Sequence, residues 1–242
     1  MSQSITGVDI SSWNHPDGEP VDWEKAYGAG LRFVVVKATQ GTGYTNPWLT
    51  RDLDDARAEG FLVGAYHYYA ANEKPDLQAN YFAFALGDQV LELGAWCDWE
   101  CYAPQAFTHN VELDSFFGEL DKVRPDAGLY CDRSWYDAFA GSSVLNRRLW
   151  LATDEVPAGA KPLIVQSVVP VSEAGIPGMV DRDVIANVRG LDLPTSPPDK
   201  PSTLGAPSAV RLARALDEGA GEVPEPPEEP EVEEPAQDLT GV

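Results

Sequence analysis

The sequence has little positive charge. Its 242 residues include 17 Lys and Arg against 39 Asp and Glu, which gives a formal net charge of -22. A protein that binds nucleic acid needs a basic surface, because binding displaces the counterions of the phosphates. The charge balance therefore argues against a nucleic-acid partner.

Long apolar runs and paired cysteines are also missing. No stretch is both apolar and long enough to cross a bilayer, so we expect no membrane partner. The three cysteines, Cys97, Cys101 and Cys131, are too few and too unevenly spaced for a disulfide framework. They also lack the paired spacing of a zinc site, and we expect reduced, packed thiols.

The composition changes near Leu193. Residues 217–242 hold ten acidic residues, five prolines and no Lys or Arg. Such a segment buries too little apolar surface to offset its ordering entropy, so we expect disorder there. Before it we expect a Pro-rich linker over 194–207 and a short helix over 208–216. The folded unit is predicted to cover 1–193.

Short apolar runs recur along this unit and predict strands. The run 31–38 is nearly continuous and rich in β-branched residues, which is typical of parallel strands covered on both faces. The other runs are 7–10, 61–68, 93–99, 128–131, 149–152, 163–166 and 179–181. Between two of them, Leu113, Phe116, Phe117 and Leu120 recur at the spacing of one helix face.

The spacing of the runs predicts the fold. The first five lie about 26 to 34 residues apart, which is the size of a βαβ unit. The last three lie about 15 residues apart, which is too close for full crossover helices. This pattern predicts an α/β fold, an irregular TIM-like barrel of five βα units followed by about three strands with short connections. An open α/β sheet is the alternative.

Charged and aromatic side chains stand at the predicted ends of these strands. Catalytic residues of such barrels come from the C-terminal strand ends. The residues at these ends are Asp9, Lys37, Tyr66, Asp98 with Glu100, Tyr130, Trp150, Gln166, and Asp181 with Asp183. We therefore expect several aromatic rings to converge on one mouth with the carboxylates, four of which, Asp9, Asp98, Glu100 and Asp181, are candidate site residues.

Asp98 and Glu100 form the sharpest pair. At i and i+2 on a strand they point to the same face, with Cα atoms roughly 6.5 to 7 Å apart. Crowded like charges raise the pKa of one partner, which then stays protonated as a general acid. Cleavage of a glycosidic bond needs such an acid and a second carboxylate, although this spacing leaves the stereochemistry open. Trp99 alternates with the acids and is expected to face a helix.

Six motifs occur in an order that resembles a known family. They are Gly-Val-Asp-Ile-Ser-Ser-Trp at 7–13, Lys-Ala-Thr-Gln-Gly-Thr at 37–42, Gly-Ala-Tyr-His-Tyr at 64–68, Asp-Trp-Glu at 98–100, Gly-Leu-Tyr at 128–130 and Val-Asp-Arg-Asp at 180–183. Together they resemble the glycoside hydrolase family 25 muramidases, the Chalaropsis-type lysozymes common among phage endolysins. The resemblance spans about 5–188. It implies a barrel of five βα units with extra strands.

The resemblance also implies an activity and residue roles. The activity is hydrolysis of the β-1,4 bond between N-acetylmuramic acid and N-acetylglucosamine in the glycan strand of bacterial peptidoglycan. Glu100 is implied as the general acid and Asp98 as the carboxylate that steadies positive charge or orients the substrate's acetamide. Asp9 and Asp181 match two further acidic positions of the groove. The residues implied to line sugar subsites are Tyr66, Tyr130, Trp150, Gln166 and Trp13. No metal or cofactor is implied.

Several residues keep a second interpretation. Tyr130 and Trp150 fit the barrel core as well as they fit a sugar subsite. Lys37 fits a buried ion-pair partner, and His67 fits a hydrogen-bonded barrel residue better than a catalytic acid or base. Gln40 also departs from the family pattern, which usually has Glu there, and the departure removes one charge from the groove.

Two aromatic residues that the family usually has, after Trp150 and beside Gln166, are absent as well. A non-catalytic virion structural or cell-wall glycan-binding protein that reuses the barrel is therefore the alternative to a phage-encoded muramidase. A hydrolase of another N-acetylated glycan is a third hypothesis, and its deacetylase version would need a divalent metal.

The N-terminus and the tail bear on localisation and partners. Residues 1–7 have neither a basic region nor an apolar stretch, so we expect no secretion signal. This favours synthesis in the host cytoplasm, followed by action on the bacterial cell wall or packaging into a virion. The acidic tail 217–242 fits a solvated tether, with a virion or other phage protein as its partner in the second interpretation.

Overall fold

The most continuous apolar run of the sequence forms a strand that is covered on both faces. The computed structural model describes residues 4–100 and 109–185, with no side-chain detail for 109 and 110. In it, β2 (Phe33–Gln40) buries its first seven residues. The other strands are β1 (Ile5–Ile10), β3 (Tyr44–Thr45), β4 (Leu62–Tyr68), β5 (Gly94–Asp98), β6 (Gly128–Asp132), β7 (Leu149–Ala152), β8 (Ile164–Gln166) and β9 (Asp181–Ile185).

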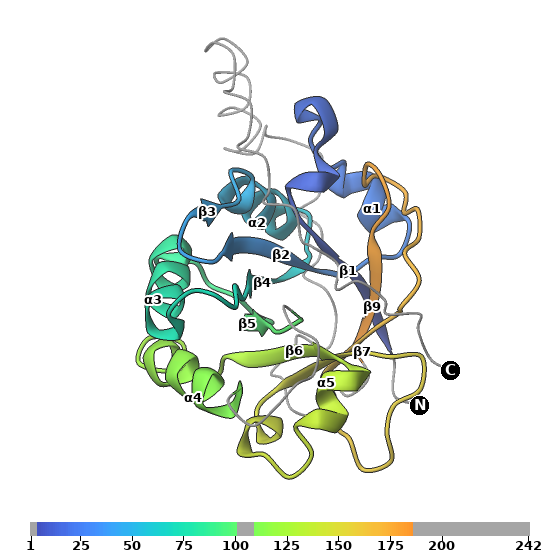
Figure 1. Ribbon diagram of the computed structural model, residues 1–242. Helices are drawn as coiled ribbons and strands as arrows, with labels where there is room; N and C mark the ends of the chain where they lie inside the picture. The colour runs from blue at the N-terminus through green and yellow to red at the C-terminus, as the bar shows by residue number, and fades with distance from the viewer. Residues whose placement is uncertain (1–3, 101–108, 186–242) are drawn as a thin grey trace, which may run out of the picture.

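Helices connect the first strands and cover the outside of the sheet (Figure 1). The α-helices are α1 (Trp23–Gly28), α2 (Leu49–Ala58), α3 (Pro75–Leu86), α4 (His109–Leu120) and α5 (Arg133–Ala138). Short 3-10 helices are η1 (Ser12–Asn14), η2 (Pro16–Gly18) and η3 (Ser143–Asn146). No helix among the described residues has the length and apolarity that a membrane crossing requires.

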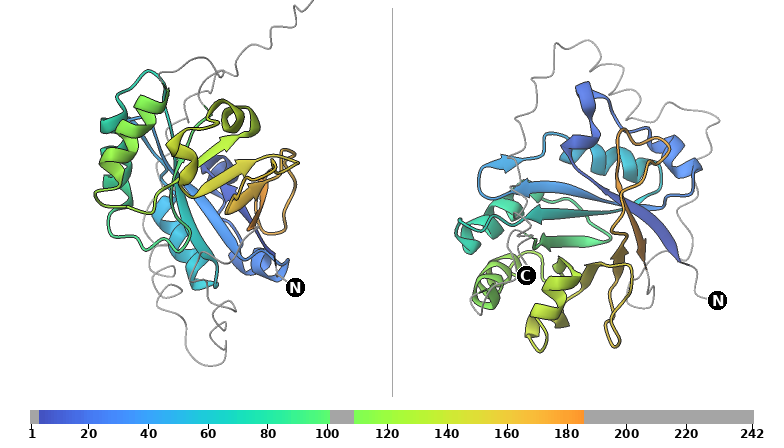
Figure 2. Two further views of the ribbon diagram at one scale, coloured as in Figure 1. Left: turned by 90° about the horizontal axis from the view of Figure 1, so that it is seen from below. Right: turned by 45° about the vertical axis from the view of Figure 1, so that its right-hand side comes forward.

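The sheet closes on itself. Its strand order is β1-β9-β8-β7-β6-β5-β4-β2-β3, and β1 also pairs with β2. Eight strands therefore form a ring, and β3 adds a short hairpin to the end of β2. Figure 2 shows the ring from two further sides. The closure confirms the predicted α/β barrel of five βα units followed by three strands, and it excludes the open sheet.

The last strand differs from its prediction in place and direction. The sequence predicts a strand over 179–181, but β9 begins at Asp181 and runs antiparallel to both β1 and β8. The segment between β8 and β9 holds a two-stranded bridge, Val171 with Val180, and no helix. A parallel return needs a crossover of a dozen or more residues, usually a helix, whereas an antiparallel one needs only a short loop. The start of β9 therefore lies where the parallel strands end.

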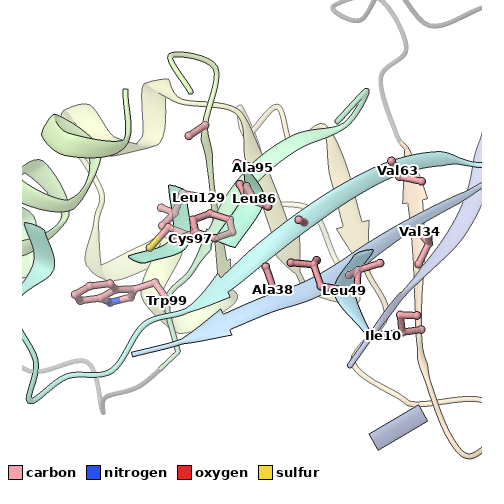
Figure 3. Close-up of a cluster of buried hydrophobic side chains, with 14 of the residues drawn as sticks. Ile10, Val34, Ala38, Leu49, Val63, Leu86, Ala95, Cys97, Trp99 and Leu129 are labelled. Atoms are coloured by element: carbon pink, nitrogen blue, oxygen red, sulfur yellow. The ribbon is translucent and has the colours of Figure 1, made fainter. Parts of the chain in front are cut away.

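Two layers of apolar side chains hold the barrel together. The outer layer lies between strands and helices and includes Val34, Val63 and Leu129 (Figure 3). Trp99 belongs to this layer and lies 5.9 Å from the ring of Trp135 on α5, which confirms that it faces a helix. Full burial of one such side chain contributes about 1.5–3 kcal/mol.

The inner layer fills the barrel itself. It includes Phe33, Trp96 and Trp150, all at most 2% exposed. Two glycines make room for the rings, because a Cβ at Gly7 would lie 2.4 Å from the ring of Phe33 and one at Gly128 would lie 2.4 Å from that of Trp96. The interior is thus a packed core that leaves chemistry to the barrel ends.

Some predictions fall outside the described residues. The linker 194–207, the helix 208–216 and the tail 217–242 lie there, together with Cys101 and the domain boundary at 193. Cys97 and Cys131 are buried and take part in no disulfide, as predicted.

Candidate active site

Five carboxylates come together at one end of the barrel. Asp98 is the last residue of β5, and Glu100 follows two residues later. Asp9 lies near the end of β1, and Asp181 and Asp183 lie on the first half of β9. The antiparallel direction of β9 is what brings its first residues to this mouth.

The Asp98 and Glu100 side chains lie on the inner side of the strand. Asp98 is 5% exposed, and Trp96, two residues before it, packs in the barrel interior. Glu100 is exposed at the edge of the mouth. Burial raises the pKa of Asp98 well above its usual range, and repulsion from Glu100 adds to the effect. The two acids therefore cannot both ionise easily.

Glu100 is tuned by its surroundings. The protein atoms of the mouth desolvate its carboxyl group, and the charges of Asp132 and Asp181 repel its own. Together these effects raise the pKa of Glu100 from 4.5 to about 6, although the charge of Lys37 opposes them. A carboxyl group with this pKa is partly protonated near neutral pH, as a general acid requires.

Asp9 faces the first residue of β9. It stands directly opposite Asp181 in the antiparallel register, and Asp183 is the next residue of β9 on the same side. Burial, followed by repulsion from Asp181, raises the pKa of Asp9 from 3.8 to about 7. Hydrogen bonds to Gln166 and Asp183 act in the opposite direction.

Two side chains link Asp9 to Glu100. Gln166 Nε2 donates to Asp9 Oδ2 over 2.7 Å. The Tyr130 hydroxyl donates to Gln166 Oε1, also over 2.7 Å, and its oxygen lies 3.5 Å from Glu100 Oε2. Gln166 is 6% exposed, so its side chain contacts protein groups more than solvent. It orients Asp9 directly and Glu100 through Tyr130.

Lys37 brings a positive charge to this cluster. It is 5% exposed, and its Nζ donates to Gln40 Oε1 over 2.8 Å. The same nitrogen lies 5.1 Å above the ring of Tyr68. Its charge lowers the pKa of both Asp98 and Glu100. Lys37 therefore offsets part of the negative charge of the mouth.

The predicted sugar-facing aromatic residues divide into two groups. Tyr66, Tyr130 and Trp150 are 9%, 8% and 2% exposed and form the floor, with the Trp150 and Tyr130 rings 4.6 Å apart. Trp13 on η1 is 71% exposed at the rim. Of these four aromatic residues, only Trp13 exposes most of its ring to solvent. The sugar-subsite roles of all four residues stay predictions.

His67 lies outside the mouth. It is fully buried between the sheet and the helices, where its ring contacts Thr39 Oγ1 at 2.7 Å and Gln78 Oε1 at 3.1 Å. Burial lowers its pKa to about 4. It is thus a neutral hydrogen-bonded residue. The described residues contain no group of three His, Cys, Asp or Glu side chains arranged to hold a metal ion.

The sequence named Asp183 only as a strand-end residue and Gln40 only as a departure from the family pattern, and it gave neither a role in the site, yet both contact members of the cluster. Asp183 is fully buried and accepts a hydrogen bond from Trp150 Nε1 over 2.8 Å. Its position two residues after Asp181 on a strand is the signal that could have identified it. The cluster as a whole offers a protonated acid beside ionised carboxylates, which is the arrangement that glycosidic cleavage needs.

Comparison with known proteins agrees with this chemistry. The family model of the Glycosyl hydrolases family 25 matches residues 8–162. The N,O-diacetylmuramidase of Chalaropsis sp is 41% identical over 183 residues, which cover 64% of this chain and 83% of that protein. YegX of Escherichia coli (strain K12) is 33% identical over 96 residues, 36% of this chain. The chain spans about a third of the length of that relative, 34%.

The fold has a counterpart among solved structures. The bacterial lysozyme from Streptomyces coelicolor matches with a TM-score of 0.65 at 24% identity, over 77% of this chain and 94% of that one. This likeness concerns the fold. The family model, in contrast, matches more than half of the sequence, from Val8 on β1 to beyond β7. The chain therefore belongs to glycosyl hydrolase family 25.

Proposed function

We propose that this protein is a muramidase that hydrolyses the β-1,4 bond between N-acetylmuramic acid and N-acetylglucosamine in peptidoglycan. The observation that carries the proposal is the pair Asp98 and Glu100 at the barrel mouth, where burial, reinforced by neighbouring negative charges, raises the pKa of both carboxyl groups and keeps a proton available near neutral pH. Family membership and the name of the Chalaropsis relative, a diacetylmuramidase, support the same substrate class.

In the proposed reaction Glu100 is the acid. Its exposed position lets it reach the glycosidic oxygen, and its raised pKa keeps a proton available for the leaving sugar. Asp98, whose raised pKa favours the protonated form, orients the substrate's acetamide. The negative charge of ionised Asp9 stabilises the positive charge that develops on the sugar ring. Whether the substrate's own acetamide attacks the sugar carbon decides between one displacement and two.

The test compares two isosteric variants. Glu100→Gln removes the proton donor, and we expect at least a hundredfold loss of muropeptide release from purified cell walls with an unchanged melting temperature. Glu24→Gln makes the same chemical change on an exposed part of α1 and is expected to leave release unchanged. Mass spectrometry of the products identifies the sugar at the reducing end.

Two results would refute the assignment. One is equal activity of Glu100→Gln and the unaltered protein. The other is tight binding of the unaltered protein to cell walls without release of muropeptides, which is the outcome that a non-catalytic glycan-binding protein gives.

A phage source is a finer part of the proposal. It rests on the resemblance to the muramidases common among phage endolysins and includes a phage or virion partner for the acidic segment 217–242. A holin gene or virion structural genes beside the coding sequence would support it. A cell-wall maintenance operon of a bacterial chromosome would contradict it.

A further inference from the structure

Asp183 is a buried carboxyl group to which the proposed reaction gives no role. It lies on β9 with no exposed surface. Its Oδ1 accepts a hydrogen bond from the indole nitrogen of Trp150 over 2.8 Å. Its Oδ2 is also buried, and within the described residues no N–H or O–H group donates to it. An ionised carboxylate would leave that oxygen unsatisfied, which is costly inside a protein.

The titratable group next to Asp183 is another acid, Asp9. Asp9 faces β9, and the carboxyl groups of Asp9 and Asp183 are within hydrogen-bonding reach of each other. Two carboxyl groups in contact share a proton, because neither can donate to the other when both are ionised. One of the two is therefore a carboxylic acid whose O–H points at its partner.

The surroundings decide which of the two holds the proton. Asp9 is half-buried and accepts a second hydrogen bond, from Gln166 Nε2 over 2.7 Å. Asp183 is fully buried, and its hydrogen bond from Trp150 occupies Oδ1, which leaves the buried Oδ2 for the proton. The negative charge is thus better solvated on Asp9, and the proton is better placed on Asp183 Oδ2.

We infer that Asp183 is a positioning residue, a neutral carboxylic acid that donates its Oδ2 proton to Asp9 and so holds Asp9 as the ionised carboxylate of the mouth. The inference rests on the proposed function, because it assigns Asp9 its state for that reaction. Burial and the charge of Asp9 also raise the pKa of Asp183 well above its usual range.

The other charged and titratable groups around this pair come from three strands, β5, β6 and β9. Asp181 on β9 and Glu100 beyond β5 repel a charge on Asp9. Tyr130 on β6 is protonated, since burial raises its pKa, and its hydroxyl bonds Gln166. Asp98 on β5 also feels the charge of Asp9. None of them donates a proton to Asp183, so its neutral form is set by Asp9, Trp150 and burial.

An asparagine offers the same hydrogen bonds as a neutral Asp183. Its Oδ1 accepts from the Trp150 indole, and its Nδ2 donates to Asp9. Leucine has a similar shape but neither group. The variants Asp183→Asn and Asp183→Leu therefore separate a donated hydrogen bond from a negative charge.

We expect Asp183→Asn to keep kcat within about threefold of the unaltered protein, with the same pH profile. Asp183→Leu removes a hydrogen bond to an ionised group, which predicts a loss of kcat of about tenfold to a hundredfold and an acidic limb displaced to higher pH. If Asp183 were ionised, Asp183→Asn would remove a charge beside Asp9 and move the acidic limb to lower pH. That shift, or an equal loss in both variants, overturns the inference.

A second measurement is independent of activity. In full-length protein labelled with 13C at the aspartate carboxyl groups, we expect a resonance that stays at the protonated position from pH 5 to pH 8 and that vanishes in Asp183→Asn. Its absence from the unaltered protein overturns the inference even if Asp183→Leu fails to fold. A protein with this resonance and no muropeptide release would contradict the proposed function alone.

Discussion

Asp9 and Asp181 stand directly opposite each other where the first strand of the barrel meets the last. Asp98 and Glu100 approach the same mouth from β5. Carboxyl groups held this close suppress one another's ionisation, so the folded protein binds protons that the unfolded chain releases. This excess of bound protons has consequences for both stability and catalysis.

Stability is expected to rise on acidification from pH 7 to pH 5. The pKa of Asp9 is about 7 in the folded protein against 3.8, and that of Glu100 is about 6 against 4.5. Raised pKa values contribute stability that is complete below about pH 4 and is lost as the pH rises towards 7. The melting temperature of Asp9→Asn should depend less on pH between pH 5 and pH 7 than that of the unaltered protein. A steeper or unchanged dependence contradicts the assignment.

A negative charge introduced at position 40 is expected to move the alkaline limit of activity. Glu at this position would pair with Lys37 Nζ, which now bonds Gln40 at 2.8 Å, and would weaken the attraction that Lys37 exerts on Glu100. The pKa of Glu100 then rises, so we expect the alkaline limb of kcat/KM to move up by about half a pH unit to one unit in Gln40→Glu.

Gln89→Glu is the matched control for this prediction. Gln89 follows α3 and precedes β5, so it lies at the opposite end of the barrel from the mouth. Gln89→Glu adds the same charge as Gln40→Glu, and we expect it to leave the alkaline limb of kcat/KM in place. An equal displacement in both variants would mean that net charge, not the pairing with Lys37, sets the profile.

Trp13 and Trp150 should respond differently to substitution. Trp13 is 71% exposed, so Trp13→Ala is expected to raise KM severalfold and change the free energy of unfolding by no more than about 0.5 kcal/mol. Trp150→Phe leaves Asp183 Oδ1 without its donor and is expected to cost about 1–3 kcal/mol of stability. Thermal unfolding and steady-state kinetics on soluble glycan check both variants. A large loss of stability in Trp13→Ala with an unchanged KM would contradict the position of Trp13 at the rim.

His15 and Asp52 form a buried pair between the segment after η1 and helix α2. His15 Nε2 lies 2.8 Å from Asp52 Oδ2, Nδ1 lies 3.0 Å from the carbonyl oxygen of Glu19, and the ring stacks on Trp48. His15→Leu leaves the Asp52 carboxyl group buried without its partner, which predicts a loss of about 3–5 kcal/mol.

The double variant tests the origin of that loss. Replacing both partners by leucine removes the buried charge, so we expect chemical denaturation to show less destabilisation than for His15→Leu alone. Equal or additive losses would show that packing against Trp48, and not the unpaired charge, carries the effect.

The sequence predicts the barrel and the position of its acid pair because both follow from short-range patterns. Alternation along β5 places Asp98 and Glu100 on one face and Trp99 on the other, and the structure has this arrangement. The direction of β9 was not predictable in this way, since alternation is the same for parallel and antiparallel strands.

Partners that meet across the barrel were also beyond the sequence patterns. Gln166 and Asp9 are 157 residues apart in the chain, and Trp150 and Asp183 are 33 apart. Periodicity says which face a side chain takes but not which strand lies opposite. The hydrogen bonds that orient the acids therefore became visible only in three dimensions.

Closure of the barrel between β1 and β9 has a consequence for biosynthesis. Asp9 emerges from the ribosome among the first residues, whereas Asp181 and Asp183 emerge after the rest of the ring has been translated. A nascent chain that stops before β9 lacks part of the constellation and exposes the edge of β1. The carboxylate cluster of the mouth is therefore complete only once the final strand has docked against the first.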